Sequence, residues 1–576
     1  MTLGKVWVVT VWLGGLGLLV IAPVQAQEGP GFAYPEWFDL PLAHEAGALY
    51  PPARAAVRTV APALPPEALW SNGYQSVQVN VDANGKNIVG DAANEPSLAV
   101  DPTNPNRIVI GWRQFDSIQS DFREAGWAYS KTNGRSWTFP GVLEQNVFRS
   151  DPVLAADAQG NFYYCSLRNT SPYTCQMFKS TNHGVSWVGP IPAYGGDKEW
   201  MEIDRTGGIG EGNLYVAWDY AGCCGNNWFT RSTDGGLTYM TPIEIPTRPY
   251  WGTVAIGPNG EVYISGGANG SNVFRCVRSS NAKDPKVTPV FELAVTVDLG
   301  GTFRYYLQGN TPNPEGLLGQ VWIAVDRSDG PTRGYVYMLS SVDPPGNDPM
   351  DVMFARSTDG GQTWSSPKRI NDDAPGTNAW QWYGTLAVAP NGRLDVIWND
   401  TRNGGGDPRL SEVFYSSSND GGATWSKNEP ITPQFNSHLG WPIQRKLGDY
   451  YDMKSDKVGA SVAYAATFNG EEDVYYLRIG DYDCNGNGIP DQRDIAEGRS
   501  TDLNHNGIPD ECEGLGDLNC DEVTNNFDID PFVLALTDPA GYAKAYPNCD
   551  RQRADINGDG AVDNFDIDPF VKLLTP

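Results

Sequence analysis

One short turn motif recurs along this chain and constrains the fold more than any other feature. The pattern Ser-x-Asp-x-Gly-x-Thr-Trp is complete at residues 357–364 and 418–425, and looser copies lie at 130–137, 180–187 and 232–239. Its Asp can accept hydrogen bonds from N–H groups of its own turn, and its Gly permits φ > 0. Its aromatic residue then begins a returning strand and buries a large area. The motif therefore predicts hairpin corners in which the Asp is structural rather than catalytic.

The spacing of this motif predicts a β-propeller between residues 76 and 480. Short β-type runs alternate there with Gly, Pro, Asn and Asp, and the motif returns at intervals of roughly 50–60 residues with one longer gap, which suits four-stranded blades. A second repeat marks seven inner strands, which begin at Glu95, Asp151, Lys198, Trp251, Gln320, Tyr383 and Tyr450. The seventh blade is one strand short, and residues 74–81 could supply it and close the ring. We predict seven blades, with six as the alternative.

The turn motif resembles the Asp-box, or BNR repeat, of sialidases and related β-propellers. The resemblance implies an all-β propeller, turns that lie away from any active site, and hydrolysis of O-glycosyl bonds as the activity to test. It does not extend to the catalytic set. The Phe/Tyr-Arg-Ile-Pro motif that carries the first sialidase arginine is not found, since Phe122-Arg123 is followed by Glu-Ala.

Any site in the funnel should use the first residues of the inner strands, because the turn motifs lie on the opposite face. Glu95 and Asp151 start neighbouring strands, and two carboxylates beside stacking aromatics are what a glycosidase needs. The catalytic candidates are Glu95, Asp151, Arg113 and Tyr450, and the substrate-binding candidates are Lys198, Trp251, Tyr383, Arg168 and Arg402. A pair that acts on a glycoside should be about 5–10 Å apart. The alternative is that both carboxylates cap strand ends and the aromatics fill the funnel.

Residues 481–576 are acidic for a local reason. The chain has a net charge of −28, and this segment holds 21 Asp and Glu against 6 Lys and Arg. Four of its loops carry oxygen-bearing side chains at positions 1, 3, 5, 9 and 12, as an EF-hand-type calcium loop does. These predicted Ca²⁺ ligands are Asp483, Asn485, Asn487, Asp491 and Asp494; Asp502, Asn504, Asn506, Asp510 and Glu513; Asp517, Asn519, Asp521, Asn525 and Asp528; and Asp555, Asn557, Asp559, Asp563 and Asp566. We expect folding of this segment to require the metal.

The four loops resemble two different protein modules, with two loops in each. Those in 481–514 share Gly-Ile-Pro-Asp and resemble thrombospondin type 3 repeats. Those in 515–576 each run into Phe-Asp-Ile-Asp-Pro-Phe-Val, at 527–533 and 565–571, and this duplicated loop–helix unit resembles a type I dockerin. In the third loop Glu522 replaces the Gly of position 6, which should weaken binding. The dockerin resemblance implies a small α-helical, EF-hand-like module whose partner is a cohesin-like protein of a polysaccharide-degrading assembly.

The N-terminus predicts export. Residues 1–26 have Lys5, an apolar run and Val-Gln-Ala at the end, which is typical of a signal peptide; a retained membrane anchor is the alternative. Residues 27–75 form a Pro/Ala-rich arm or linker, and no later stretch is long and apolar enough to span a bilayer. Nine cysteines then suit disulfides, with Cys165–Cys175, Cys484–Cys512 and Cys520–Cys549 as candidate pairs that spacing does not fix.

These observations predict a secreted, extracellular or cell-surface protein that acts on glycan or polysaccharide. The acidic charge argues against a nucleic-acid partner, and four His without Cys/His spacing argue against a zinc enzyme. The leading hypothesis is a glycoside hydrolase or a relative of one, in extracellular polysaccharide breakdown. The main alternative is a non-catalytic propeller that binds glycan or protein in a cell-surface assembly.

Overall fold

The computed structural model describes residues 69–219, 221–267, 271–304, 309–503, 505–520, 523–547 and 549–574. The predicted signal segment and residues 27–68 of the predicted arm lie outside the described residues. Among the helices that are described, none is long and apolar enough to cross a membrane.

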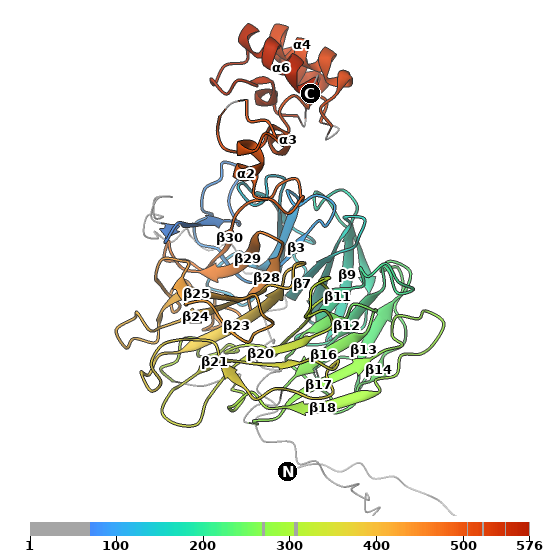
Figure 1. The fold of residues 1–576 in the computed structure, drawn as a ribbon, viewed down its shortest axis with the longest axis vertical. Helices are drawn as coiled ribbons and strands as arrows, with labels where there is room; N and C mark the ends of the chain where they lie inside the picture. The colour runs from blue at the N-terminus through green and yellow to red at the C-terminus, as the bar shows by residue number, and fades with distance from the viewer. Residues whose placement is uncertain are drawn as a thin grey trace, which may run out of the picture. The chain divides into compact units, whose positions relative to one another are not determined.

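In the described part of the chain the strands pair into seven antiparallel sheets, which are the blades of a propeller (Figure 1). Blade 1 holds β3 (Ala92–Val100), β4 (Ile108–Phe115), β5 (Glu124–Ser130) and β6 (Thr138–Val142). Blade 2 holds β7 (Ser150–Ala156), β8 (Phe162–Arg168), β9 (Thr174–Ser180) and β10 (Val188–Pro192). Blade 3 holds β11 (Trp200–Ile203), β12 (Leu214–Ala217), β13 (Asn227–Ser232) and β14 (Ile243–Glu244). Blade 4 holds β15 (Val254–Ile256), β16 (Val262–Gly266), β17 (Phe274–Ser279) and β18 (Leu293–Val297).

The remaining blades follow the same order. Blade 5 holds β19 (Trp322–Val325), β20 (Val336–Val342), β21 (Asp351–Ser357) and β22 (Lys368–Arg369). Blade 6 holds β23 (Gln381–Val388), β24 (Leu394–Asp400), β25 (Leu410–Ser418), β26 (Glu429–Pro430) and β27 (Phe435–Asn436). Blade 7 holds β28 (Asp452–Ser455), β29 (Gly459–Ala466), β30 (Asp473–Gly480) and, from the other end of the chain, β2 (Tyr74–Gln78) and β1 (Trp70–Ser71). The seven-blade prediction is confirmed, and the six-blade alternative is wrong.

Blade 7 closes the ring with strands from both ends of the propeller. β2 pairs with β30, with Val77 opposite Tyr476, so the segment that was predicted to supply the missing strand does so. The Asn80 side chain continues the junction: its Nδ2 donates to Asp473 Oδ1 at 2.6 Å, and its Oδ1 accepts from Val474 N at 3.0 Å. Without β2, β30 would present unpaired backbone groups at an open sheet edge.

The turn motif connects the third and fourth strands of its blades, as its residues predict. In the copy after β21, Asp359 Oδ1 accepts from Ser357 Oγ at 2.7 Å and from Thr363 N at 2.9 Å. The hydrogen bonds from Thr363 lower the pKa of Asp359 to about 2. In the copy after β25, a Cβ at Gly422 (φ 82°) would come within 2.4 Å of the Phe354 ring. The Asp thus stabilises the turn through its hydrogen bonds, and the Gly leaves room for a side chain of the neighbouring blade.

Short helices follow the propeller. They are α2 (Asp491–Ala496), α3 (Asp510–Glu513), η3 (Asn526–Asp528), α4 (Ile529–Thr537), α5 (Pro539–Ala545), η4 (Arg551–Ala554), η5 (Asn564–Asp566) and α6 (Ile567–Leu574). The duplicated unit packs symmetrically, because Phe532 of α4 and Phe570 of α6 stack at 4.0 Å. Leu518, Ala535 and Ile556 complete a small buried core around them.

The predicted disulfide pairs form in the tail, and the predicted pair in the propeller does not. Cys484–Cys512 and Cys520–Cys549 are disulfides, and the adjacent Cys223 and Cys224 form a third. Cys165 and Cys175 are free and buried, so that predicted pair is not formed. The strand register explains the difference, since Cys165 lies opposite Met177 and Leu167 lies opposite Cys175, which places the two thiols diagonally.

Candidate functional site

The predicted starts of the inner strands are equivalent positions in the ring. Glu95, Asp151, Lys198, Trp251 and Tyr383 have φ values of 52°, 47°, 51°, 54° and 62°. Non-glycine residues rarely adopt this left-handed conformation, and it is found mostly at constrained positions. In blades 1, 2 and 6 the pairing with the second strand shifts register at this point. The chain therefore makes the same bulge in blades 1, 2 and 6, and Lys198 and Trp251 adopt the same conformation just before β11 and β15. We call this end of the inner strands the start face.

Glu95 lies in a buried ion-pair network on the start face. Its carboxylate is 3.1 Å from Arg113 Nε and 3.2 Å from Lys446 Nζ, and its side chain is fully buried, as are those of Arg113 and Lys446. Burial raises the pKa of Glu95 to about 8, against the opposing effect of the two cations. The candidate acid is thus inside the protein and close to two positive charges.

Asp151 belongs to the same network. Lys198 Nζ is 2.9 Å from Asp151 and 2.8 Å from Asp449, and Lys446 Nζ is 2.6 Å from Asp449. Asp449 therefore joins the two predicted carboxylates through a lysine on each side. Lys446 and Asp449 were not predicted from the sequence. The signal that could have found them is their position just before the seventh inner strand.

Two loops cover the start face, which explains why the network is buried. Asn313 Nδ2 donates to the Tyr383 hydroxyl at 2.7 Å and to Gly448 O at 2.9 Å. Leu317 N donates to Asp449 Oδ1 at 2.8 Å. The segments 309–318 and 437–449 thus meet above the inner strands. The sequence predicts an open funnel, whereas these two loops cover it. Their position could not be read from the repeats, because the loops belong to no repeat and their contacts are long-range.

The other predicted site residues have structural contacts. The Tyr450 hydroxyl donates to Pro152 O at 2.9 Å, and its ring meets Trp200 edge-on at 5.6 Å. The Trp251 ring packs on Tyr250 at 4.8 Å.

The two outer arginines are not part of the network. Arg402 is paired with Asp372 at 2.6 Å and Asp400 at 2.8 Å, and neither of these carboxylates belongs to it. Arg168 lies partly buried at the end of β8. The structure therefore joins Glu95, Asp151, Arg113 and Lys198 in one network, and it gives Tyr450, Trp251 and Arg402 other partners.

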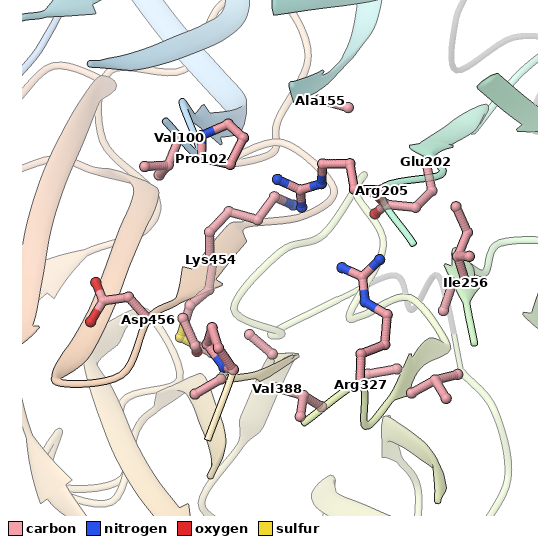
Figure 2. Close-up of a pocket in the computed structure, with 18 of the residues that line it drawn as sticks. Val100, Pro102, Ala155, Glu202, Arg205, Ile256, Arg327, Val388, Lys454 and Asp456 are labelled. Carbon is pink, nitrogen blue, oxygen red and sulfur yellow. The ribbon is translucent and has the colours of Figure 1, made fainter. Parts of the chain in front are cut away.

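A cavity of about 700 Å³ lies between the blades at the other ends of the inner strands. Most of its walls come from the ends of the seven inner strands and the turns that follow, among them Ala155, Ile256 and Val388 (Figure 2). Asp483 and Gly486 of the first predicted calcium loop also line it. The side chains of Arg205, Arg327 and Lys454 extend into it from blades 3, 5 and 7. We call it the channel site. Sequence reasoning missed it, although Asp-Arg follows both the third and the fifth inner strand, at 204–205 and 326–327.

The predicted metal loops share one turn wherever the structure describes it. Gly488, Gly507 and Gly560 have φ values of 86°, 82° and 86°. Each donates its N–H to the Asp five residues earlier: Asp483 at 2.7 Å, Asp502 at 3.0 Å and Asp555 at 2.9 Å. A glycine at position 6 and a carboxylate at position 1 are the geometry of an EF-hand-type loop.

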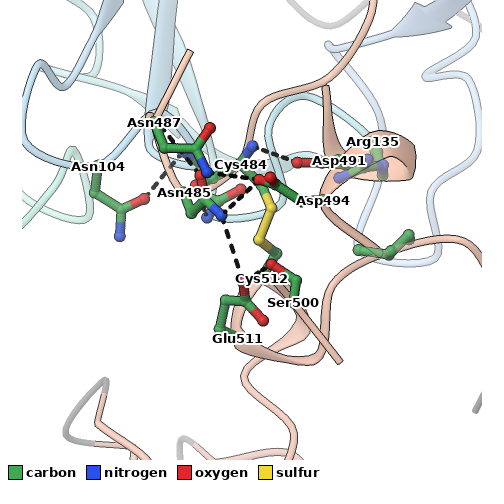
Figure 3. The surroundings of a disulfide bond; sticks show 12 residues. Asn104, Arg135, Cys484, Asn485, Asn487, Asp491, Asp494, Ser500, Glu511 and Cys512 are labelled. Atoms are coloured by element: carbon green, nitrogen blue, oxygen red, sulfur yellow. Dashed lines mark hydrogen bonds and ion pairs between the residues drawn. A yellow bond between two sulfur atoms is a disulfide. The ribbon is translucent and has the colours of Figure 1, made fainter. Parts of the chain in front are cut away.

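The first loop fits a hard cation (Figure 3). Asp483 Oδ1 and, in the second loop, Asp510 Oδ2 are buried and have no hydrogen-bond partner among the described residues. Two other carboxylates of the first loop lie close to arginines: Asp494 Oδ1 is 3.6 Å from Arg499 Nη1, and Asp491 Oδ2 is 3.2 Å from Arg135 Nη2. The Nδ2 atoms of Asn485 and Asn487 both donate to Asp494 Oδ2, at 3.2 and 2.6 Å. Rotation of either amide by half a turn would present its oxygen to the same point, as Ca²⁺ requires.

In the third loop the contact with an arginine falls on position 1. Arg553 Nη1 lies 2.7 Å from Asp517 Oδ2, so a cation of the protein already contacts the carboxylate of position 1. Asp528 accepts from Leu518 N and Asn525 N, both at 2.8 Å. Asn504 of the second loop and Asp521 of the third lie outside the described residues.

No protein-family model matches this chain, and no curated protein matches it either. Solved structures similar to it include an endosialidase of phage phi92, with a TM-score of 0.40 and 9% identity over 71% of this chain and 69% of that one. Another is the Hadza microbial sialidase Hz136, with a TM-score of 0.34 and 13% identity over 67% of this chain and 66% of that one. A third is YCF48 bound to D1 peptide, with a TM-score of 0.38 and 12% identity over 73% of this chain and 98% of that one. These similarities are too low to assign an activity, and the fold rests on the strand pairing of the chain itself.

Proposed function

We propose that this chain is a non-catalytic, glycan-binding propeller of an extracellular assembly, attached through a calcium-dependent C-terminal module. The observation that carries the proposal is the buried network on the start face. A general acid must come within hydrogen-bond reach of the glycosidic oxygen, and a nucleophile must reach the sugar carbon. Glu95 and Asp151 are completely buried, and each is paired with a cation.

One observation favours glycoside hydrolysis as a second candidate. Burial raises the pKa of Glu95 to about 8 against the opposing effect of Arg113 and Lys446, and a raised pKa is what a general acid needs. This role requires the loops 309–318 and 437–449 to open and admit substrate. The catalytic set would then be Glu95, Asp151, Arg113 and Tyr450, with Lys198, Trp251, Tyr383, Arg168 and Arg402 around the sugar.

One experiment separates the two candidates. The protein from residue 27 onward is incubated in millimolar Ca²⁺ with sialosides and neutral and acidic polysaccharides, and it is also applied to a glycan array. Glu95→Gln and Asp151→Asn are assayed in parallel, with thermal melting to confirm that each is folded. We expect binding on the array and no released sugar. Release of sugar that both variants abolish would establish a glycosidase and overturn the proposal.

The tail supplies the calcium dependence in this proposal. The oxygen ligands would be the carboxylates and amides at positions 1, 3, 5, 9 and 12 of the four loops. Asp483 Oδ1 and Asp510 Oδ2 support this assignment, since each is buried without a hydrogen-bond partner among the described residues, which is costly for a carboxylate oxygen. Calorimetric titration with Ca²⁺ tests it, and Asp494→Ala should remove one binding event.

The partner of the tail would be a cohesin-like protein. The duplicated helices expose matching apolar side chains: Phe527 and Phe565 are 79% and 75% exposed, and Ile529 and Ile567 are 42% and 41% exposed. Exposed apolar residues repeated in two equivalent units indicate a binding surface. A pull-down with the whole chain, with and without Ca²⁺, and with Phe527→Ala and Phe565→Ala, tests this partner.

A further inference from the structure

The channel site concentrates positive charge in a strongly acidic protein. Arg205 follows β11 in blade 3 and Arg327 follows β19 in blade 5, and both guanidinium groups point into the cavity (Figure 2). Arg205 Nε and Arg327 Nη1 are buried and have no hydrogen-bond partner among the described residues. Guanidinium groups in proteins are normally paired, because a desolvated and unsatisfied charge is costly.

The neighbouring carboxylates are engaged elsewhere. Asp204 Oδ1 accepts from Thr206 N at 2.9 Å, and Asp326 Oδ1 accepts from Ser328 N at 2.7 Å, so each holds its own turn. Asp204 Oδ2 is buried without a hydrogen-bond partner among the described residues, but Asp204 does not line the cavity. Asp101 is paired with Arg107 at 3.2 Å, and Asp456 is paired with Arg478. Two carboxylates remain on these walls. Glu202 acts on Arg205, and its Oε1 accepts from Ile203 N at 3.1 Å. Asp483 accepts from Gly488 N at 2.7 Å and belongs to the first predicted calcium loop. These contacts leave the two arginines with unused donors.

The direction in which the pKa of Arg205 is shifted is consistent with these unused donors. Burial lowers the pKa of Arg205, Glu202 opposes the effect, and Arg327 adds to it. The two guanidinium groups therefore repel each other across the cavity. A third cation, Lys454, enters from blade 7 and is paired with Asp452 at 2.9 Å. An anion between the arginines would relieve the repulsion.

The rest of the cavity suits a sugar. Its volume of about 700 Å³ falls within the range of small-molecule sites. Trp200 and Trp322 lie in the wall beside Ala155 and Ile256, with the two indole rings 5.1 Å apart. Aromatic and aliphatic surfaces can contact the apolar face of a pyranose, and arginine donors match the oxygens of a carboxylate or a sulfate.

We propose that the channel site binds the oxyanion group of an acidic sugar, a carboxylate or a sulfate ester, with Arg205 and Arg327 as its ligands. This inference rests on the proposed glycan-binding function and adds the class of glycan. It also places the site on the face that carries the turn motifs, opposite the face that the sequence favoured.

Calorimetry on the whole chain tests the site. The probes are trigalacturonic acid, a sulfated chondroitin disaccharide and, as the neutral control, maltotriose. The variants are Arg205→Gln, Arg327→Gln and the conservative Arg205→Lys, with Arg304→Gln as the matched control, because Arg304 forms a partly exposed ion pair with Asp343 and does not line the cavity. We expect one acidic probe to bind, and added salt to weaken its binding. Arg205→Gln and Arg327→Gln should each bind this probe about tenfold more weakly, while Arg304→Gln should bind it as the wild type does.

Thermal melting without ligand gives a second measurement. Removal of one of these guanidinium groups should leave the Tm unchanged or raise it. If Arg327→Gln melts no lower than the wild type and still loses binding, misfolding does not explain the loss. Failure of both acidic probes to bind, or equal affinity in wild type and both Gln variants, would overturn the inference. Neutral glycans that still bind in that case would leave the proposed function standing.

Discussion

At the scale of single residues, Lys198 shows how the start face is held together. It contacts Asp151 at 2.9 Å and Asp449 at 2.8 Å, and it is almost completely buried. Removal of one partner from a buried ion pair is strongly destabilising, whereas replacement of both by neutral groups costs much less. We expect Lys198→Met to lower the free energy of unfolding by about 3–5 kcal/mol, and Asp151→Asn in the same chain to recover part of it. Urea unfolding of the four members of the cycle measures this; simple additivity would show that the pair is not coupled.

Glu124 is a residue whose titration should be visible in stability. It is buried, its Oε1 accepts from Asn146 N, and burial raises its pKa to about 7. The native state then holds a proton that the unfolded state has released, so stability falls as pH rises from about 4.5 to about 7 and is constant above. Glu124→Gln should flatten this part of the Tm profile and be the more stable protein at pH 8. Asp329→Asn, at a fully exposed carboxylate, is the control, and an unchanged slope in Glu124→Gln would contradict the assignment.

At the scale of elements, the closing strand should determine the stability of the ring. A chain that starts at residue 83 lacks β1 and β2 and leaves β30 as an open edge, whereas a chain that starts at residue 69 keeps both. We expect the shorter chain to melt lower and to aggregate, because an unpaired edge is a template for pairing with other chains. Differential scanning calorimetry and light scattering compare the two; equal Tm values would mean that β2 is dispensable.

The same scale separates what the sequence could predict from what it could not. The inner strands were predictable because their pattern repeats from blade to blade, and the closing segment 74–81 was predictable because the seventh blade is one strand short. The bulges at Glu95 and Asp151 were not predicted, since the sequence marked these residues only as strand starts. The loops 309–318 and 437–449 follow no repeat, so their closure over the start face could not be read from the sequence. That Arg205 Nε and Arg327 Nη1 have no hydrogen-bond partner among the described residues could not be read from the sequence either, since it depends on which carboxylates the neighbouring turns have already used.

At the scale of the whole molecule, the acidic tail and the propeller should respond differently to calcium. The tail carries 21 acidic against 6 basic residues, and the disulfides Cys484–Cys512 and Cys520–Cys549 constrain its chain without neutralising that charge. The propeller instead has a large apolar core and a closed ring of sheets. Chelation should therefore unfold the tail and leave the propeller folded.

Limited proteolysis with EGTA or Ca²⁺ tests this separation. We expect the tail to be degraded in EGTA while a fragment close to residues 76–480 persists, and the whole chain to resist in millimolar Ca²⁺. Calorimetry should then show two transitions, of which only the lower shifts upward with calcium, because a ligand stabilises the unit that binds it. Asp494→Ala should lower the calcium response of the tail, and Asp329→Asn should not. Identical fragments in EGTA and Ca²⁺ would show that these loops fold without the metal, and the calcium-dependent attachment would fall with that result.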